Sequence, residues 1–315
     1  MIDGRRVLVT GGSGVIGREL LARLAKYNCD VLNLDRVDLV GDFGDRIEHH
    51  TVDIAFDGMD LIREFDPHVI LHLSAAFERS TESTDFWKTN WMDNSIVSHR
   101  LLDFAASSDT VEVFTFASSY LIYEPAQYMS DEYIPEPRLL NENDRVSPRN
   151  VCGAAKYYTE RELDFLCGHN KPGMRAVSAR IYRVYGCGSR DVVSRWVRSA
   201  IANETIELYN EENRFDYIYA GDVAEGLLQL TLSSSAQGVV NLGSGNARQV
   251  SELAAGVGAH FPEWFEKIRR EGGKEAYERS CADVALLEKI TGWCPEVKLE
   301  DGIAKIIEFE QEKGT

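Results

Sequence analysis

Three glycines at positions 11, 14 and 17 have the spacing that most directly indicates a bound ligand. They follow a short β-branched apolar run at 6–10 and precede a segment at 19–25 with the apolar spacing of a helix. Glycines there permit a tight turn, close approach of a pyrophosphate and close packing of helix on strand. The helix N-terminus supplies N–H groups and a positive dipole end. This strand–turn–helix context predicts a dinucleotide-binding site.

Asp35 ends the next apolar run, at 31–34, and lies 18 residues after Gly17. A carboxylate at this place can accept hydrogen bonds from a ribose and repels a 2′-phosphate, so Asp35 favours NAD over NADP. Arg36 keeps NADP open as an alternative, because an arginine there can accommodate the 2′-phosphate. A turn-forming Asp after a strand is the other reading of Asp35.

The Gly-x-x-Gly-x-x-Gly spacing resembles that of the short-chain dehydrogenase/reductase superfamily, in its extended branch of NAD-dependent sugar-nucleotide epimerases and dehydratases. Similar motifs recur along essentially the whole chain, among them Asn-Leu-Gly-Ser-Gly at 241–245 and Gly-Trp-x-Pro at 292–295. The resemblance implies NAD as cofactor and a nucleotide-diphosphate sugar as substrate. It places the cofactor contacts at Gly11, Gly14, Val15, Ile16, Gly17, Asp35, Arg36, Asp53, Ile54, Leu73, Ser74, Ala75 and Lys156.

The resemblance also implies a catalytic group made of a Ser or Thr and a Tyr-x-x-x-Lys motif. In that group the Tyr takes a proton from a sugar hydroxyl while a hydride leaves for NAD. Ser119 and Lys156 match the pattern, but Cys152 stands where the family has its Tyr. No lysine in the chain has a Tyr four residues before it, so the motif is not simply misplaced. Residues 119–121 are Ser-Tyr-Leu rather than Thr-Asp-Glu, which disfavours the sugar 4,6-dehydratases.

A cysteine at position 152 has a suitable proton affinity but a short reach. Its reference pKa of about 8.5 lies below the value of about 10 for tyrosine. The thiol, however, ends ~3–4 Å short of a phenol oxygen, and a misplacement of ~1 Å can cost ~100-fold in rate. Either a water or a shifted substrate bridges the gap, or a tyrosine takes the proton, or the protein binds without turnover. An inactivating substitution and a merely structural cysteine also fit the sequence. The tyrosines near the predicted site are Tyr120, Tyr123, Tyr182 and Tyr185.

An arginine-rich stretch is the predicted substrate-binding region. Arg183 replaces an Asn that, in the family, lies near the substrate's diphosphate. A guanidinium can grip phosphate or carboxylate oxygens in a bidentate way, so a diphosphate contact, a carboxylate contact and a surface salt bridge are equal alternatives. We predict substrate contacts at Ser119, Tyr120, Arg183, Arg190 and Arg214, and expect the arginines at 180, 195 and 198 in the same pocket.

The elements that must position these residues alternate between strand and helix. Short apolar strands at 6–10, 31–34, 69–73, 111–116 and 174–182 alternate with helical segments, of which those at 85–107 and 150–167 are long. This order predicts an α/β fold, a Rossmann-like doubly wound parallel sheet with the site along one edge.

The predicted domains follow from this order. We expect an NAD-binding domain at 1–182, to which 216–243 returns, and a smaller C-terminal substrate-binding lobe made of 183–215 and 244–315. Segment 124–148 is rich in Pro, Asn, Asp and Glu and is expected to be a loop over the site. The resemblance implies a homodimer in which the two long helices pair with those of a second subunit.

Charge and cysteine content argue against other classes of protein. The chain carries 34 basic and 51 acidic residues, a net charge of −17, which disfavours nucleic-acid binders and polybasic membrane-surface modules. No apolar run reaches the roughly 18 residues of a membrane span, and no signal core follows the N-terminal charges. We therefore expect a cytoplasmic protein without a membrane partner. The six cysteines are scattered without a zinc-like spacing, so no metal site is predicted.

The leading functional hypothesis is an NAD-dependent epimerase that acts on a nucleotide-diphosphate sugar through a transient keto intermediate. Epimerisation comes first because the return of hydride to the other face needs no additional motif. A dehydratase or reductase of the same family is an alternative. A catalytically impaired NAD-binding protein is the rival reading, and it rests on Cys152.

Overall fold

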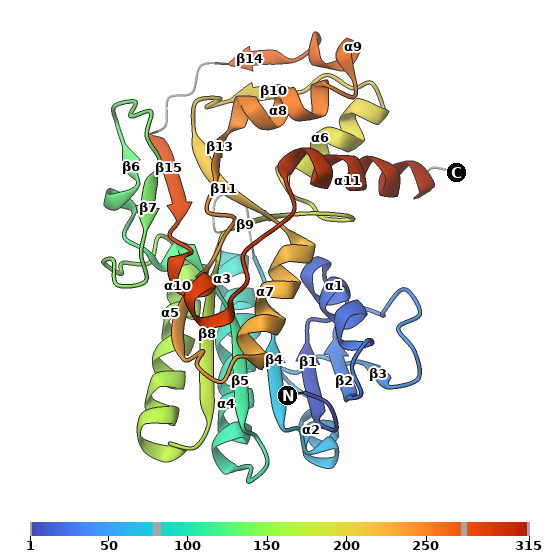
Figure 1. The fold of residues 1–315 in the computed structure, drawn as a ribbon, viewed down its shortest axis with the longest axis vertical. Coiled ribbons are helices and arrows are strands. Elements are labelled where there is room, and N and C mark those ends of the chain that lie inside the picture. Colours follow the sequence, from blue (N-terminus) through green and yellow to red (C-terminus); the bar gives the residue numbers. More distant parts are fainter. Residues whose placement is uncertain (1, 78–82, 272–275, 314–315) are drawn as a thin grey trace.

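The chain's computed structural model describes residues 2–77, 83–271 and 276–313. Within these residues a seven-stranded, all-parallel sheet forms the lower half of the molecule in Figure 1, in the order β12-β8-β5-β4-β1-β2-β3. Its strands are β1 (Arg6–Thr10), β2 (Asp30–Asp35), β3 (Ile47–Thr51), β4 (Val69–His72), β5 (Val113–Ser119), β8 (Arg175–Ile181) and β12 (Gly238–Leu242). The predicted doubly wound α/β sheet is confirmed.

Helices cover both faces of this sheet. On one face α2 (Met59–Phe65), α4 (Val97–Ser107) and α5 (Val151–Phe165) contribute Ile62, Leu101 and Leu163 to a buried cluster. On the other face lie α1 (Val15–Leu24), α7 (Ala220–Leu232) and α10 (Ala285–Thr291). Because both faces are covered, the strands read as continuous apolar runs rather than as alternating patterns.

A smaller lobe occupies the upper half of Figure 1 and holds the C-terminal helix. Its main sheet has the order β13-β11-β15-β6, with β7 on β15 and β9 on β11, and β10 pairs separately with β14. These strands are β6 (Met129–Ser130), β7 (Arg138–Leu140), β9 (Arg183–Tyr185), β10 (Glu207–Tyr209), β11 (Arg214–Tyr219), β13 (Ala247–Gln249), β14 (Arg269–Glu271) and β15 (Tyr277–Ala282). Helices α6 (Val192–Ile201), α8 (Val250–Gly258), α9 (Pro262–Phe265) and α11 (Leu299–Lys313) pack around a core of their own.

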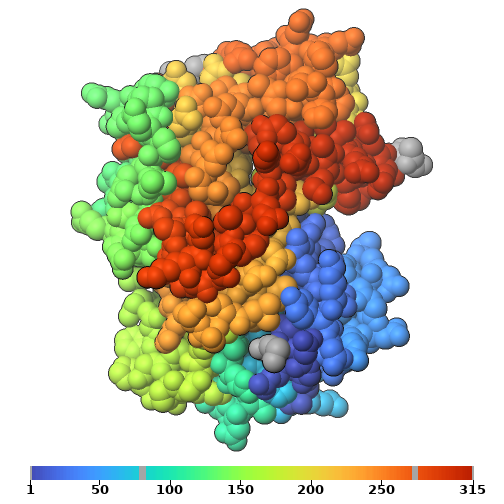
Figure 2. All heavy atoms as spheres, viewed as in Figure 1, coloured from blue at the N-terminus to red at the C-terminus, as the bar shows by residue number. Residues whose placement is uncertain are grey.

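The chain passes between the two halves several times. Strand β11 belongs to the smaller lobe, whereas α7 and β12, which follow it, return to the parallel sheet. Helix α10 then packs against α7 and β12. In Figure 2 the orange spheres of α7 and the red spheres of α10 lie together, below the rest of the smaller lobe. The segment at 124–148 is not simply a loop, since it contains β6 and β7, which pair with β15.

The first of the two long predicted helices is interrupted by a wider turn. It consists of α3 (Thr84–Asn90), a π-helical segment η1 (Trp91–Ile96) and α4. The second consists of α5 followed by another π-helical segment at its end, η4 (Leu166–Asn170). Segments of π-helix occur frequently at functional sites, and η1 lies beside the edge of the sheet where the predicted site residues meet.

The register of the parallel strands brings the predicted site together. Thr10 of β1 pairs with Leu34 of β2 and with His72 of β4, and His72 pairs with Phe116 of β5. The residues that follow these partners therefore emerge at one edge. This edge carries the glycine turn, Asp35, the 73–75 turn and Ser119, which is the arrangement expected for parallel α/β sheets.

Candidate active site

The glycine turn has no room for side chains. Gly11 has a φ of +79°, and a Cβ there would lie 2.6 Å from the backbone nitrogen of Ser74. At Gly17 a Cβ would lie 2.3 Å from the carbonyl oxygen of Gly11, so this glycine is required for the contact between α1 and the turn. Gly14 caps α1 without a side-chain hydrogen bond. The first N–H groups of α1 thus have no side-chain acceptor at the cap, which suits a phosphate group.

A cavity of about 330 Å³, which we call the edge cavity, opens beside this turn. Asp35 lines it and accepts hydrogen bonds from the backbone of Ser13 at 2.9 Å and of Val37 at 3.2 Å. The bond from Val37 stabilises the local turn that was the alternative interpretation of Asp35. The carboxylate therefore both shapes the turn and lines the cavity. The predicted cofactor residues that line the cavity are Gly11, Gly14, Asp35, Arg36, Asp53, Ile54, Leu73, Ser74 and Ala75.

Four of the predicted cofactor residues do not line the edge cavity. Val15, Ile16 and Gly17 lie in the first turn of α1, and Lys156 lies further along the sheet edge on α5. Sequence reasoning missed several lining residues, which are Ser13, Leu34, Val37, Val52, Asp93 and Val97. Asp93 and Val97 come from a helix whose approach to the glycine turn depends on tertiary packing.

Cys152 and Lys156 lie one turn apart on α5, with their side chains close to each other. The thiol is buried, and its sulfur lies 3.8 Å from the carbonyl oxygen of Ala76 and 3.9 Å from Nδ2 of Asn94. Lys156 donates from Nζ to the carbonyl oxygen of Ala117 at 2.8 Å. Burial lowers the pKa of Lys156 to about 8, and the charge interaction with Cys152 partly opposes this shift. Asn150 caps the N-terminus of α5, and its side chain accepts from the backbone of Gly153 at 2.8 Å.

Ser119 ends β5, and its Oγ accepts a hydrogen bond from the backbone of Leu121 at 3.2 Å. The next residue, Tyr120, is buried and stacks on Tyr182 with ring centroids 4.9 Å apart. Ser119 remains partly exposed. Its hydroxyl hydrogen is thus available to a substrate oxygen while its lone pair holds the following turn.

Asn94 is the polar side chain near Cys152 that sequence reasoning did not identify. It donates to the carbonyl oxygen of Ala76 at 2.9 Å and accepts from the Ala76 amide at 2.7 Å. Its Nδ2 also donates to Asn90, which in turn donates to the carbonyl oxygen of Val151. These bonds tie the turn after β4 to the start of α5. The available signal was a run of polar residues inside an otherwise apolar helical segment.

The four tyrosines considered as substitutes for the missing one are poorly suited to take a proton. Burial raises the pKa of Tyr120, Tyr182 and Tyr185, and it raises that of Tyr123 to about 12. The hydroxyl of Tyr123 donates to Oδ1 of Asn241 at 2.7 Å. Tyr185 packs in the core of the smaller lobe. A general base at neutral pH needs a pKa near the working pH, so these four tyrosines do not suit that role.

A cluster of charged side chains lies just beyond Tyr120. The buried carboxylate of Glu278, on β15, binds Arg149 at 2.6 Å and Arg183 at 3.5 Å and accepts from the Tyr120 hydroxyl at 3.2 Å. The guanidinium of Arg183 lies 3.7 Å from the centre of the Phe215 ring. Its Nε is buried and has no hydrogen-bond partner among the described residues. Two guanidinium groups on one carboxylate leave a surplus positive charge.

The other arginines of the stretch are dispersed. Arg214 lies 4.0 Å from Glu252, and Arg190 is exposed. Arg180 forms a fully buried pair with Glu160 at 2.8 Å, and Arg198 pairs with Glu310 at 2.8 Å. The prediction that all these arginines gather in one pocket is therefore wrong for Arg180 and Arg198, because their guanidinium groups neutralise structural carboxylates.

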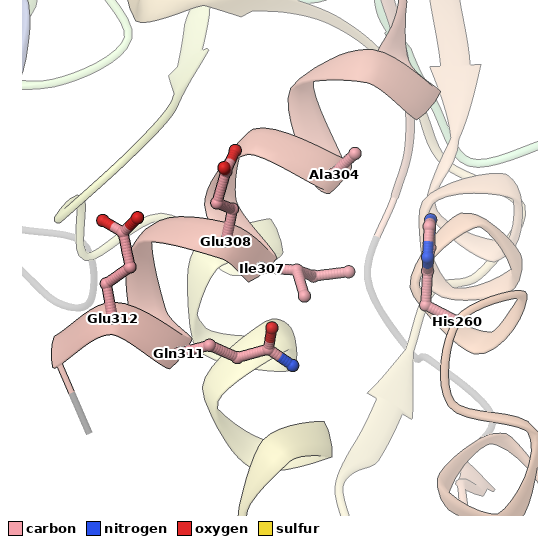
Figure 3. A pocket seen from close by; sticks show the side chains of 6 residues that line it. All are labelled: His260, Ala304, Ile307, Glu308, Gln311 and Glu312. Atoms are coloured by element: carbon pink, nitrogen blue, oxygen red, sulfur yellow. The ribbon is translucent and has the colours of Figure 1, made fainter. Parts of the chain in front are cut away.

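A second cavity, of about 260 Å³, shares no residue with the predicted site. Figure 3 shows it between His260, which follows α8, and one side of α11, with Ile307 and Gln311 directed across it. Among residues 2–77, 83–271 and 276–313, no three His, Cys, Asp or Glu side chains are grouped as a metal site would require. In the same ranges no helix has both the length and the apolarity to cross a membrane.

Comparison with known proteins places this geometry in a family. A family model described as the NAD dependent epimerase/dehydratase family matches residues 7–243. The UDP-glucose 4-epimerase of Mycolicibacterium smegmatis is 28% identical over 98% of this chain and 99% of that protein. A putative UDP-glucose 4-epimerase of Methanocaldococcus jannaschii is 27% identical over 96% of this chain and 97% of that protein. The solved structure of MoeE5 in complex with UDP-glucose and NAD is similar in fold, with a TM-score of 0.84 and 22% identity over 98% of this chain and 100% of that one.

Proposed function

This chain belongs to the NAD dependent epimerase/dehydratase family, and on that premise we propose that it epimerises a nucleotide-diphosphate sugar, with C4 of a UDP-hexose as the first candidate. The observation that carries the proposal is the position of Ser119, Cys152 and Lys156 at the sheet edge that also bears the glycine turn and the edge cavity. One edge thereby combines a nucleotide site with groups able to move a proton.

The residues of the edge fit NAD. Gly11 and Gly17 keep the turn tight, because a Cβ at either position would collide with backbone atoms. A tight glycine turn that leads into the N-terminus of α1 suits a pyrophosphate. We assign Asp35 to the ribose hydroxyls and Asp53 and Ile54 to the adenine, and their common place in the lining of the edge cavity supports this assignment. When bound, NAD supplies a hydride acceptor and donor.

The protein's own side chains carry out the proton transfer. Ser119 orients the sugar hydroxyl that loses its proton, and Cys152 accepts that proton as a thiolate. Lys156, with a pKa of about 8, is largely protonated at pH 7, and its charge favours the thiolate. Because the thiol is ~3–4 Å shorter than a phenol, one water bridges it to the hydroxyl.

We assign the surplus positive charge of Arg149 and Arg183 to an anionic group of the substrate. The orphaned Nε of Arg183 and the surplus guanidinium charge on Glu278 support this assignment. In a chain with a net charge of −17, such a local excess of cations favours an anion that the whole protein would otherwise repel. We also propose Arg190 and Arg214 as substrate contacts, on the basis of their position in the sequence alone.

A homodimer is supported by exposed aromatic side chains on the two long helices. Trp87 and Trp91, on α3 and η1, are 60% and 58% exposed, and Tyr158 and Phe165, on α5, are 52% and 62% exposed. Such a patch of large apolar side chains is typical of an interaction surface. We propose that a second copy of the chain covers it.

The proposal is tested by incubating the purified protein with UDP-glucose, UDP-galactose and other UDP-sugars and observing the products by NMR. Formation of a C4 epimer, with hydride retained, is the expected result. Silence across the panel, with NAD shown to be bound, would count against epimerisation.

A catalytically impaired NAD-binding protein is the second candidate, and Cys152 is the observation that favours it. Cys152→Tyr separates the two. If the native protein is silent and Cys152→Tyr is active, position 152 is the defect. If the native protein is active and both Cys152→Tyr and Cys152→Ala lose activity, the cysteine belongs to a modified mechanism. Cys167→Ala, at a partly exposed cysteine away from the edge, is the matched control.

A further inference from the structure

Among the described residues that line the edge cavity, Arg36 is the one whose type favours a 2′-phosphate, yet its side chain is already bound. Nη1 donates to Oδ1 of Asp93 at 3.0 Å and Nη2 donates to Oδ2 at 2.8 Å, so both ends of the guanidinium fork are paired with one carboxylate. Asp53 lies 4.0 Å away on the same guanidinium. A bidentate pair of this kind is geometrically specific and stronger than a single neutral hydrogen bond.

The wide turn η1 explains why a carboxylate is available there. Asp93, Asn94 and Ser95 are 7%, 1% and 5% exposed, so three consecutive polar residues are buried. In a regular α-helix successive side chains are spread around the axis, and three in a row would not share a buried side. The π-helical turn directs Asp93 toward Arg36 while Asn94 reaches Ala76 and Cys152.

The charges that line the edge cavity therefore oppose a 2′-phosphate. Among the described residues that line the cavity, Asp35, Asp53 and Asp93 provide three carboxylates against the guanidinium of Arg36. A free Arg36 would offset this excess and could bind the phosphate in a bidentate way. Bound by Asp93 through both terminal nitrogens, Arg36 must first break this ion pair to bind a phosphate.

We propose that Asp93 determines the coenzyme preference of this protein by holding Arg36 away from the 2′-phosphate position of NADP. Asp35 is then not the only determinant of coenzyme preference, because the ion pair with Asp93 also keeps the neighbouring Arg36 from binding a phosphate. Asp93 acts here as a positioning residue through Arg36. The inference rests on the proposed binding of NAD in the edge cavity.

The test measures the dissociation constants of NADH and NADPH, by nicotinamide fluorescence and by calorimetry, on protein freed of bound nucleotide. Asp93→Asn keeps the shape of the side chain but removes the charge. We expect it to bind NADPH on the order of tenfold or more tightly than the native protein, as one charge-assisted hydrogen bond to a phosphate would give. NADH affinity is measured beside it, and the ratio of NADPH affinity to NADH affinity should rise on the same order. The double variant Arg36→Ala/Asp93→Asn should lose the gain, and Asp60→Asn, at a fully exposed carboxylate on α2, should show none.

A second variant leaves Asp93 in place. Arg36→Lys conserves the charge, but an ammonium cannot form the bidentate pair, and this half-exposed position tolerates the change. We expect Arg36→Lys to bind NADPH several-fold more tightly than the native protein. If both Asp93→Asn and Arg36→Lys still bind NADH and leave the ratio of NADPH affinity to NADH affinity within twofold of native, the inference is wrong although the cofactor site stands. A gain in NADPH affinity that persists in Arg36→Ala/Asp93→Asn would also contradict the inference. If the native protein binds neither nucleotide, the proposed cofactor site fails together with the inference.

Discussion

Lys156 is expected to cost this protein stability, and its replacement by methionine should reveal that cost. The ammonium is 6% exposed, is held by the carbonyl oxygen of Ala117 and lies over the ring of Phe116. Burial lowers its pKa from 10.5 to about 8. A charged group buried without a strong counter-ion is destabilising, and an apolar side chain of similar length removes the penalty.

The magnitude follows from the pKa. A fall from 10.5 to about 8 corresponds to about 3 kcal/mol of unfavourable interaction for the charged form. Methionine forfeits the hydrogen bond to Ala117, which is worth about 1 kcal/mol. We therefore expect Lys156→Met to raise the free energy of unfolding at pH 7 by about 2 kcal/mol, while any epimerase activity is lost.

The pH dependence has a definite sign. Below pH 8 the lysine is protonated in both the folded and the unfolded chain, so the full cost is present. Between pH 8 and 10.5 the unfolded chain binds more protons than the folded one, and the native protein gains stability relative to the variant as pH rises. The advantage of Lys156→Met should therefore shrink across this window. Other groups titrate there as well, so the difference between the two proteins is the informative quantity.

The assay is urea unfolding, followed by far-UV circular dichroism, of nucleotide-free protein from pH 7 to 10. Lys305→Met, at an exposed position on α11, is the control and should stay within about 0.5 kcal/mol of native. An advantage for Lys156→Met that is absent at pH 7, or that does not change between pH 7 and 10, would refute the reasoning.

Three further predictions concern the glycine turn, the proposed substrate end and the proposed dimer. Gly17→Ala should abolish NADH binding, measured by fluorescence, because its Cβ would lie 2.3 Å from the Gly11 carbonyl oxygen; the control Gly168→Ala, where no atom lies within 4 Å of the added Cβ, should bind normally. Arg183→Asn should weaken UDP-sugar binding in calorimetry by roughly tenfold, the value of one charge-assisted contact, and an unchanged affinity would remove Arg183 from the substrate site. Trp91→Asp should shift the protein to monomers in light scattering, since a charge would be buried at the proposed interface, whereas a dimer of native stability would exclude this face.

Much of the fold could be predicted from local patterns. The alternation of apolar strands with amphipathic helices defined the parallel sheet, because covered strands and single-faced helices leave distinct apolar periods. The wide turn η1 was not predictable, since its residues Trp91–Ile96 have no breaker and read as ordinary helix. Strands β6 and β7 were missed because each is short and exists only through its pairing with the distant β15.

The candidate site divides in the same way. The spacing of Gly11, Gly14 and Gly17 and the position of Asp35 indicated a dinucleotide from the sequence alone, because that requirement is local: backbone without Cβ atoms, then a free helix end. Ser119, Lys156 and the cysteine that replaces the family's tyrosine at position 152 were equally visible in the sequence.

Only the tertiary structure decided which charges are available. Arg180 and Arg183 are three residues apart, yet Arg180 is paired with Glu160, whereas Arg183, beside Glu278, keeps an Nε without a partner among the described residues. Arg36 stands next to Asp35 in the chain but is bound by Asp93, which a wide helical turn brings from a different element. Local sequence specifies the types of groups and the backbone that can carry them. Their charge state and their freedom depend on partners distant in the sequence, and only the folded chain brings those partners into contact.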